Sequence, residues 1–340
     1  MKNGLLHDLC VIDAPSGRED AVRAFILARL AELPTKKEVT VDPMGNVIVH
    51  LFGRQPAQKR LLIDAHMDEV GFLVAAITSD GLLRFEPVGG IDKQVLFGHR
   101  VRIGAQRGVI GGKAIHQCKG KEKETIPEND TMLIDIGAPD RETAEKLVHI
   151  GEDGTFDNGF IEWGNGFFCG KAVDDRVGCA LLLTVAETQP EYDLWLSFSV
   201  QEEVGLRGAG VVGNTVKPDI AIALDATTAA DTVGSSDENC VCRVRGGAVV
   251  SFADRATLYD RPLYDRIRAA ADEHGIAAQT KTRVAGGNNA GAIQRSHTGV
   301  QMAAISLPCR YIHSPSCVGH WDDVQAMEDL LRVLTEELPA

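Results

Sequence analysis

A buried strand that runs into two carboxylates and a glycine turn is encoded by the stretch Ser197-Phe198-Ser199-Val200-Gln201-Glu202-Glu203-Val204-Gly205-Leu206-Arg207-Gly208-Ala209. Apolar residues alternate with other residues from 194 to 200, which is the period-2 pattern of a strand. Adjacent residues at a strand end point in different directions, so Glu202 and Glu203 can serve one pocket in two ways, one holding a metal ion and the other moving protons. A lone Glu-Glu pair more often forms a solvated turn, so the other acidic and histidine motifs decide the interpretation.

Length and composition are those of a globular protein with a large core. The 340 residues exceed the usual size of one domain, so we expect one large domain or two. A formal net charge of −13 argues against nucleic acid as a partner, because phosphate binding needs a basic face. No window approaches the roughly 18 continuous apolar residues that span a bilayer. The start of the chain also lacks the long apolar stretch of a signal peptide, so we expect a cytoplasmic protein with no membrane partner.

Eight cysteines are scattered along the chain, and none forms the paired C-x-x-C motif of a zinc site. Cys240-x-Cys242 has no matching second pair. Several cysteines lie in apolar runs, as Cys179 does between Val177 and Leu181, which favours buried free thiols.

The first segment predicts two helices, a hairpin and a buried strand. A short helix is predicted over 5–12, and Ser16-x-x-Glu19 fits a capping box that opens an amphipathic helix extending to residue 33. Strand patterns at 39–41 and 47–49 flank a turn and predict a hairpin.

The next apolar strand ends at His66 and Asp68, which share one face of a strand. This arrangement suits a metal-ligand histidine whose second ring nitrogen is held by a carboxylate. A purely structural His-Asp pair would give the same pattern.

Between residues 70 and 165 the pattern changes to short β-like runs separated by glycine turns, with one helix-like stretch at 142–148 and a charged loop at 119–130. This segment contains none of the compact carboxylate clusters found on either side of it. We predict that residues 70–165 form an inserted β-rich domain, a small barrel with a role in dimerisation or as a lid. Residues 1–69 and 166–340 then form one discontinuous α/β domain.

The α/β pattern returns at Asp174 and Asp175, which open an apolar helix. A helix N-terminus favours carboxylates, so capping accounts for one of the two aspartates and leaves the other for a site. A buried strand at 220–224 ends in Asp225, and a strand pattern at 302–307 leads to His313. A helix is predicted over 258–274, a strand near 279–284 and a terminal amphipathic helix from residue 322.

Acids and histidines therefore follow several buried strands or begin a helix. In open α/β sheets, sites gather outside the carboxyl ends of the strands, so we predict that these side chains form a metal site. Two histidines and three carboxylates are too many ligands for one tetrahedral zinc ion, and they suit two divalent ions that share a bridging carboxylate. The residues concerned are His66, Asp174, Asp225, His313 and one glutamate of the pair Glu202 and Glu203.

These motifs make the sequence resemble the co-catalytic metallo-aminopeptidases of the glutamyl aminopeptidase and deblocking aminopeptidase group, some of which were labelled endoglucanases. The matching segments follow in order across nearly the whole chain: 65–71, 171–176, 201–205, 224–226 and 310–314. The resemblance implies a mixed-sheet α/β/α metallopeptidase domain with an inserted β-barrel. It also implies homo-oligomers, in which dimers assemble into a tetrahedral dodecamer with an internal chamber.

The resemblance further implies a role for each site residue. Zinc or cobalt, with manganese as a further possibility, would occupy two positions in each subunit. Glu202 would be the general base, and Asp68 would orient His66. The implied ligands are His66, Asp174 and Asp225 for one ion, and Asp174, Glu203 and His313 for the other, with Asp174 bridging.

Two departures from the family pattern stand near the implied site. Asp175 occupies a position where many relatives carry asparagine. In the glycine loop at 286–291, Asn288-Asn289 replaces the common Thr-Asp, which removes a carboxylate suited to a substrate's ammonium group. Arg310 has two interpretations, since it can read a substrate carboxylate or pair with an internal acid.

We therefore predict an aminopeptidase that uses a metal-activated water to remove N-terminal residues from short peptides. One alternative is a related amidohydrolase that acts on N-acyl amino acids. Another is a peptide-binding scaffold that has lost catalysis, although an intact ligand set with Glu202 counts against it. Glycanase activity is disfavoured, because glycosidases usually employ two carboxylates without a metal.

Overall fold

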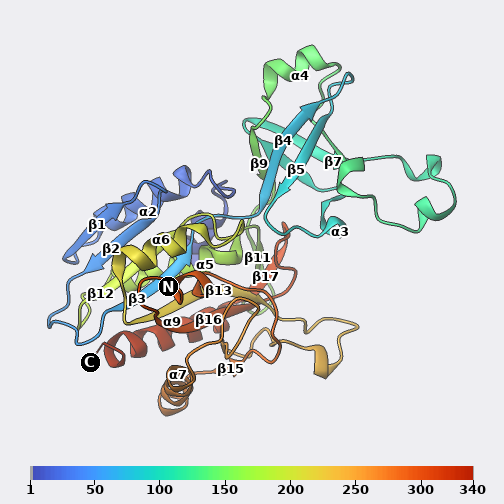
Figure 1. Cartoon of the computed structure of the whole chain (residues 1–340). Coiled ribbons are helices and arrows are strands. Elements are labelled where there is room, and N and C mark those ends of the chain that lie inside the picture. Colours follow the sequence, from blue (N-terminus) through green and yellow to red (C-terminus); the bar gives the residue numbers. More distant parts are fainter. Residues whose placement is uncertain (1–2, 340) are drawn as a thin grey trace.

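The computed structural model describes residues 3–339 and consists of an α/β body and a β-barrel that projects from it (Figure 1). Met1 and Lys2, with which the segment inspected for a signal peptide begins, lie outside the described residues. The predicted fold class, a mixed α/β sheet structure with a small barrel, is confirmed. Among the described helices, none is both long and apolar enough to cross a membrane.

The body is built on an eight-stranded sheet of order β1-β2-β12-β3-β13-β16-β14-β15. The four strands β12, β3, β13 and β16 run parallel, so their carboxyl ends meet at one edge. The strands are β1 (Lys37–Val41), β2 (Val47–Leu51), β3 (Leu61–His66), β12 (Leu194–Ser199), β13 (Ile220–Thr228), β14 (Ala248–Val250), β15 (Ala278–Thr280) and β16 (Gln301–Cys309).

Helices cover both faces of this sheet. Strand β3 is apolar on both sides, because Leu61 and Ile63 pack into one hydrophobic cluster and Leu62 into another. The first cluster contains buried residues of α1 (Asn3–Cys10), α2 (Asp20–Glu32), α5 (Val173–Ala186), α7 (Arg261–Glu273) and α9 (Trp321–Glu337). The second contains residues of α6 (Arg207–Val216) and α8 (Ala290–Ile293). The result is an α/β/α body.

The barrel closes in the order β4-β5-β8-β7-β6-β9 and has a core of its own. Phe72 lies edge-on to Phe85 and Phe156, with ring centroids 5.5 and 5.0 Å apart. Its elements are β4 (Gly71–Ile77), β5 (Leu83–Val88), α3 (Lys93–Leu96), β6 (Arg100–Ile103), β7 (Gln106–Gly111), β8 (Leu133–Asp135), α4 (Arg141–Leu147) and β9 (Asp153–Phe156). The helix-like stretch predicted at 142–148 is α4.

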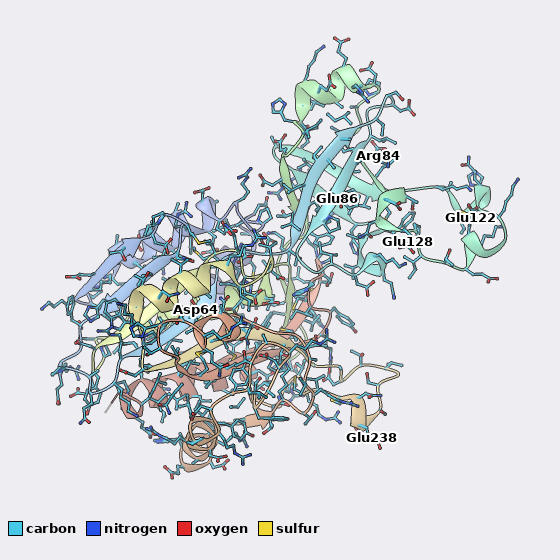
Figure 2. The ribbon with its side chains drawn as sticks, in the orientation of Figure 1. Asp64, Arg84, Glu86, Glu122, Glu128 and Glu238 are labelled. Atoms are coloured by element: carbon cyan, nitrogen blue, oxygen red, sulfur yellow. The ribbon has the colours of Figure 1, made fainter. Side chains whose placement is uncertain are left out.

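The connection between β7 and β8, which includes the charged loop predicted at 119–130, projects away from the body (Figure 1). It contains three short 3-10 turns, η1 (Ile115–Gln117), η2 (Gly120–Lys123) and η3 (Asn129–Thr131). Figure 2 shows Glu122 and Glu128 on this loop, whereas Asp64 lies inside the body. A fourth 3-10 turn, η4 (Asp237–Asn239), lies on a loop of the body.

A three-stranded sheet connects the region after the barrel to the end of the chain. It has the order β10 (Ile161–Trp163), β11 (Phe167–Gly170) and β17 (Cys317–His320), all antiparallel. Strand β10 belongs to the range predicted for the inserted domain, yet its partner β11 leads directly into α5. The domain limits at 69/70 and 165/166 stay a prediction.

The predicted capping box is wrong. Helix α2 begins at Asp20, and no side chain caps it. The Ser16 hydroxyl donates a hydrogen bond to Asp68 Oδ2 at 2.6 Å. The Glu19 carboxylate accepts hydrogen bonds from the main-chain N–H groups of Gly17 and Gln201, at 2.7 and 3.1 Å. Instead of capping the helix, both side chains connect the segment before α2 to residues that follow β3 and β12, namely Asp68 and Gln201.

The cysteines are free thiols, and six of the eight are buried, as predicted. Other elements are shorter than predicted. Helix α7 begins at Arg261, because Asp260 caps it by accepting a hydrogen bond from the N–H of Leu263. Strand β15 ends at Thr280, four residues before the predicted end near residue 284.

A buried ion pair joins the segment after β3 to the segment before α5. Lys171 Nζ lies 2.6 Å from Glu69 Oε1, and both side chains are buried. Lys171→Met leaves the Glu69 carboxylate without its nearest cation, so we expect the free energy of unfolding to fall by about 3 kcal/mol. Urea unfolding followed by circular dichroism measures the change.

The matched control is Lys146→Met. Lys146 forms a comparable pair with Glu142 at 2.8 Å, but both side chains are exposed on α4. Solvent screening makes such a pair contribute little, so the control should unfold like the parent protein. An equal loss of stability in both variants would contradict the interpretation of the buried pair.

Candidate metal centre

The parallel edge of the sheet brings all five predicted ligands together. His66 is the last residue of β3, and Asp225 lies in β13. The others come from chain segments beside that edge: Glu203 follows β12, Asp174 lies at the start of α5, and His313 follows β16. The topology therefore collects side chains that are up to 247 positions apart in the sequence, which is the separation of His66 and His313.

The ligand atoms form two groups that share one carboxylate. In the first ligand group, His66 Nε2 lies 3.2 Å from Asp174 Oδ1 and 3.9 Å from Asp225 Oδ1. In the second ligand group, His313 Nε2 lies 3.2 Å from Asp174 Oδ2 and 3.4 Å from Glu203 Oε1. Within each group the ligand atoms lie within 4.8 Å of one another. Asp174 directs one oxygen to each group and so lies between two positions suited to a cation.

Burial makes the negative charge of this cluster costly. It raises the pKa of Glu203 to about 7, and it raises the pKa of Asp225 well above its usual value with help from the Asp174 charge. Asp174 behaves in the opposite way, because the two histidines outweigh its burial and lower the pKa of its carboxyl. Cations in the two groups would offset this repulsion.

The histidines respond to the same carboxylates. Burial alone lowers the pKa of His313, but Asp174 and Glu203 outweigh it and raise the value to about 10. The pKa of His66 also lies well above its usual value, because Asp174 and Asp68 outweigh the effect of burial. The raised pKa values favour the protonated, positively charged form of both imidazoles when no cation is bound, and a cation that binds at Nε2 must displace that proton.

Asp68 supports the site in two ways. The main-chain oxygen of Asp68 lies 3.0 Å from His66 Nδ1, whereas its carboxylate is 3.5 Å from the same nitrogen. The carboxylate accepts hydrogen bonds from the N–H groups of Glu202 and Glu203, at 3.0 and 3.1 Å. Asp68 thus holds the main chain of the Glu-Glu pair as well as the imidazole of His66.

Glu202 differs from its neighbour. Its side chain is 9% exposed and lines the same cavity as the ligands, but its carboxylate makes no hydrogen bond to any of residues 3–339. Burial, aided by the charges of Glu203 and Asp174, raises the pKa of Glu202 well above its usual value. A buried, unpaired carboxylate with a raised pKa is suited to accept a proton.

The residues that depart from the family pattern have definite places. The Asp175 carboxylate accepts hydrogen bonds from the N–H groups of His66 and Gly178, at 3.3 and 2.9 Å. It therefore holds the last residue of β3 against the first turns of α5. Arg310 forms two hydrogen bonds with Asp231, at 2.7 and 2.9 Å, and therefore pairs with an internal acid.

The two asparagines of the glycine loop point in different directions. Asn288 lines the cavity. Asn289 is buried and donates hydrogen bonds to Asp64 Oδ2 and Ser199 Oγ, at 2.8 and 2.7 Å. Asn289 therefore anchors the loop to the sheet, and only its neighbour faces the space above the ligands.

Sequence reasoning missed Asp64 and Lys281. Asp64 lies inside β3 and accepts hydrogen bonds from Ser197 and Asn289, at 2.5 and 2.8 Å, while burial raises its pKa to about 6. An acid within the apolar run of a strand was the available signal. Lys281 is buried beside the cavity, and no motif marked it.

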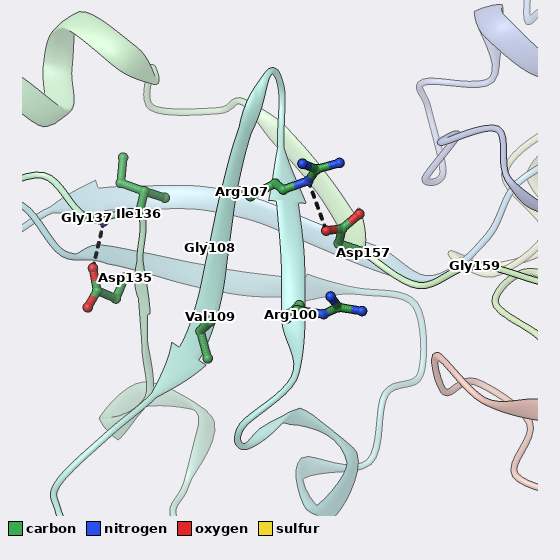
Figure 3. Close-up of a pocket in the computed structure, with 9 residues that line it drawn as sticks. All are labelled: Arg100, Arg107, Gly108, Val109, Asp135, Ile136, Gly137, Asp157 and Gly159. Atoms are coloured by element: carbon green, nitrogen blue, oxygen red, sulfur yellow. Dashed lines mark hydrogen bonds and ion pairs between the residues drawn. The ribbon is translucent and has the colours of Figure 1, made fainter.

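The cavity above the ligands has a volume of about 440 Å³. A second cavity of about 640 Å³ lies on the barrel (Figure 3), where Arg107 Nε pairs with Asp157 Oδ2 at 3.2 Å. That cavity contains no cluster of acids and histidines among its lining residues, so the candidate site is the first one. Its lining comprises Gly90, Asp174, Glu202, Glu203, Leu206, Asp225, Ala226, Thr227, Thr228, Val241, Lys281, Ala285, Gly286, Gly287, Asn288, Ile312 and His313.

Comparison with known proteins agrees with this geometry. The model of the M42 glutamyl aminopeptidase family matches residues 45–330, a range that includes both ligand groups. The chain is 32% identical to the glutamyl aminopeptidase of Lactococcus lactis, over 97% of this chain and 94% of that protein. It is 31% identical to the lysyl aminopeptidase of Pyrococcus furiosus, over 96% of this chain and 95% of that protein.

A solved peptidase structure is similar to this chain over nearly its whole length. The TET1 peptidase of Pyrococcus horikoshii, described as able to assemble into a tetrahedron or a large octahedral shell, is similar with a TM-score of 0.87 and 30% sequence identity. The similarity covers 98% of this chain and 99% of that one.

The titration of the ligands predicts how cation binding depends on pH. Glu203, with a pKa of about 7, and His313, with a pKa of about 10, both hold protons in weakly acidic solution. Since a cation must displace these protons, the apparent affinity for Mn²⁺ or Co²⁺ should rise at least about tenfold from about pH 6.5 to about pH 8.5. Calorimetric titration in buffers of different ionisation enthalpy measures both the affinity and the protons released. An affinity independent of pH, with no proton release, would contradict the assignment.

Proposed function

Since the chain belongs to the M42 glutamyl aminopeptidase family and is an aminopeptidase, we propose that its reaction uses two divalent cations, one at each ligand group. The observation that carries this proposal is the shared Asp174 carboxylate, whose two oxygens face two separate imidazoles. Short peptides with a free N-terminus are the proposed substrates.

The donor set fits such cations. Ligands placed about 2.0–2.2 Å from a tetrahedral ion lie roughly 3.3–3.6 Å from one another. The ligand atoms that face each other here are 3.2 to 3.9 Å apart. Imidazole and carboxylate ligands suit zinc and cobalt, and manganese also accepts them. When bound, such ions supply Lewis acidity toward the scissile carbonyl and make a water molecule more acidic.

Glu202 is the proposed general base. Its carboxylate takes a proton from the attacking water and returns it to the amine of the leaving peptide. The hydrogen bonds that the N–H groups of Glu202 and Glu203 donate to the Asp68 carboxylate support this role, because they hold the base and the neighbouring ligand in one orientation.

We also propose that the protein is a homo-oligomer in which dimers build a dodecamer, and that it works in the cytoplasm. The assembly described for the P. horikoshii relative supports the first point. The barrel, which projects from the body, is the proposed dimerisation or lid element (Figure 1). Light scattering coupled to size-exclusion chromatography should give the mass of twelve subunits, and a monomer mass would contradict the assembly.

The decisive variant for the chemistry is Glu202→Gln. It keeps the shape of the side chain and removes the base, so kcat should fall at least about 100-fold with bound metal unchanged. Turnover of aminoacyl p-nitroanilides measures kcat, and elemental analysis measures the metal content. A chelator should abolish turnover of the parent protein.

The matched control is Glu86→Gln, an exposed position on β5 of the barrel, which should leave turnover unchanged. Unaltered turnover of Glu202→Gln would overturn the proposed base. A parent protein that hydrolyses N-acyl amino acids in preference to free N-termini would favour the amidohydrolase alternative.

A further inference from the structure

We propose that Lys281 selects substrates whose first residue has an acidic side chain. This inference rests on the proposed function and deepens it, because family membership leaves the preference open. The two relatives compared above are named for opposite side-chain charges, glutamyl in one case and lysyl in the other.

Lys281 is a buried cation without an anion. Its side chain is 7% exposed, and its ammonium donates a hydrogen bond to the main-chain oxygen of Ala285 at 2.7 Å. An ammonium has three donors, and within residues 3–339 no carboxylate lies within 4.0 Å of this one. Both Lys281 and Ala285 line the cavity above the ligands. The remaining donors are therefore available to a molecule in that cavity.

The contrast with Lys171 shows what is missing. Lys171 is also buried, but it lies 2.6 Å from Glu69 and 3.2 Å from Asp13. Leaving a buried charge unpaired is costly, and proteins normally supply a partner. At Lys281 the partner is absent from the described chain, which is the arrangement expected when a ligand brings the anion.

Asn288 adds a second donor to the same cavity. Its Oδ1 accepts hydrogen bonds from the N–H of Ala290 at 3.0 Å and from the Tyr259 hydroxyl at 3.4 Å, which orients the amide. Within the described part of the chain its NH₂ group donates no hydrogen bond and stays available as a donor. The side chain is largely buried and lines the cavity beside Gly286 and Gly287. An amide NH₂ together with an ammonium recognises a carboxylate.

The other charged groups of the lining belong to the candidate metal centre or to Glu202. Lys281 is thus the cation of the lining outside the proposed centre, and Val241 and the two glycines beside it are uncharged. A first residue with a carboxylate supplies the missing anion. A first residue with an ammonium instead brings two positive charges together in a buried place, which disfavours it.

Aminoacyl p-nitroanilides test this directly, because they have no C-terminal carboxylate. Glutamyl and glutaminyl anilides differ by one charge at nearly constant shape. We expect kcat/KM for the glutamyl anilide to exceed that for the glutaminyl anilide at least about tenfold, with the lysyl anilide lowest. Lys281→Met should reduce kcat/KM for the glutamyl anilide at least about tenfold and change the glutaminyl value less than about threefold.

Two further variants separate recognition from folding. Lys281→Glu should reverse the preference and favour the lysyl anilide, a gain that a misfolded protein cannot show. Lys146→Met, on the exposed surface of the barrel, should leave every ratio unchanged. An equal loss for all anilides in Lys281→Met, with no reversal in Lys281→Glu, would overturn the inference and assign Lys281 a structural role.

A peptide substrate also has a carboxylate at its C-terminus. A comparison of the dipeptide Ala-Ala with alanyl p-nitroanilide tests whether Lys281 binds that group. If Lys281→Met lowers kcat/KM only for the dipeptide, the ammonium binds the C-terminus and the inference is overturned. Turnover by the parent protein without preference for the glutamyl anilide overturns this inference and leaves the proposed function standing. Failure to hydrolyse any anilide with metal present overturns the proposed function and this inference with it.

Discussion

Electrostatic repulsion among buried carboxylates is the constraint on which the rest of the structure depends. Asp174, Glu202, Glu203 and Asp225 line one cavity, and their charges would separate in a flexible chain. Four parallel strands prevent this, because their hydrogen-bonded register fixes where each strand ends. The apolar clusters on both faces of the sheet supply the rigidity. Two imidazoles and, in the proposed function, two cations balance the charge that this scaffold holds in place.

Support for the ligands comes from residues outside the two ligand groups. Asp68 joins the end of β3 to the Glu-Glu turn, Asp175 holds the main chain of His66, and Asn289 anchors the glycine loop to Asp64. Each of these contacts links segments distant in sequence. The site is therefore positioned by the sheet edge as a unit rather than by any one loop.

Much of the fold was predictable, because hydrophobic period and turn residues are local. The alternation at 194–200 and the apolar run ending at His66 identify strands of a sheet buried on both faces, and the glycine-rich middle identifies the barrel. The family motifs placed the five ligands, which lie together, although their roles stay predictions. Contacts between distant segments were beyond local patterns. Ser16 therefore fitted a capping box but bonds to Asp68, and Lys281 carried no motif at all.

The position of Lys281 has an evolutionary consequence. The segment from Lys281 to Asn288 connects β15 to α8 and supplies neither ligands nor the proposed base. In the proposed function, one segment of the chain therefore selects the substrate, and other segments supply the residues that cleave the bond. Substitutions in this connecting segment can diversify what the enzyme accepts while the reaction machinery is inherited intact.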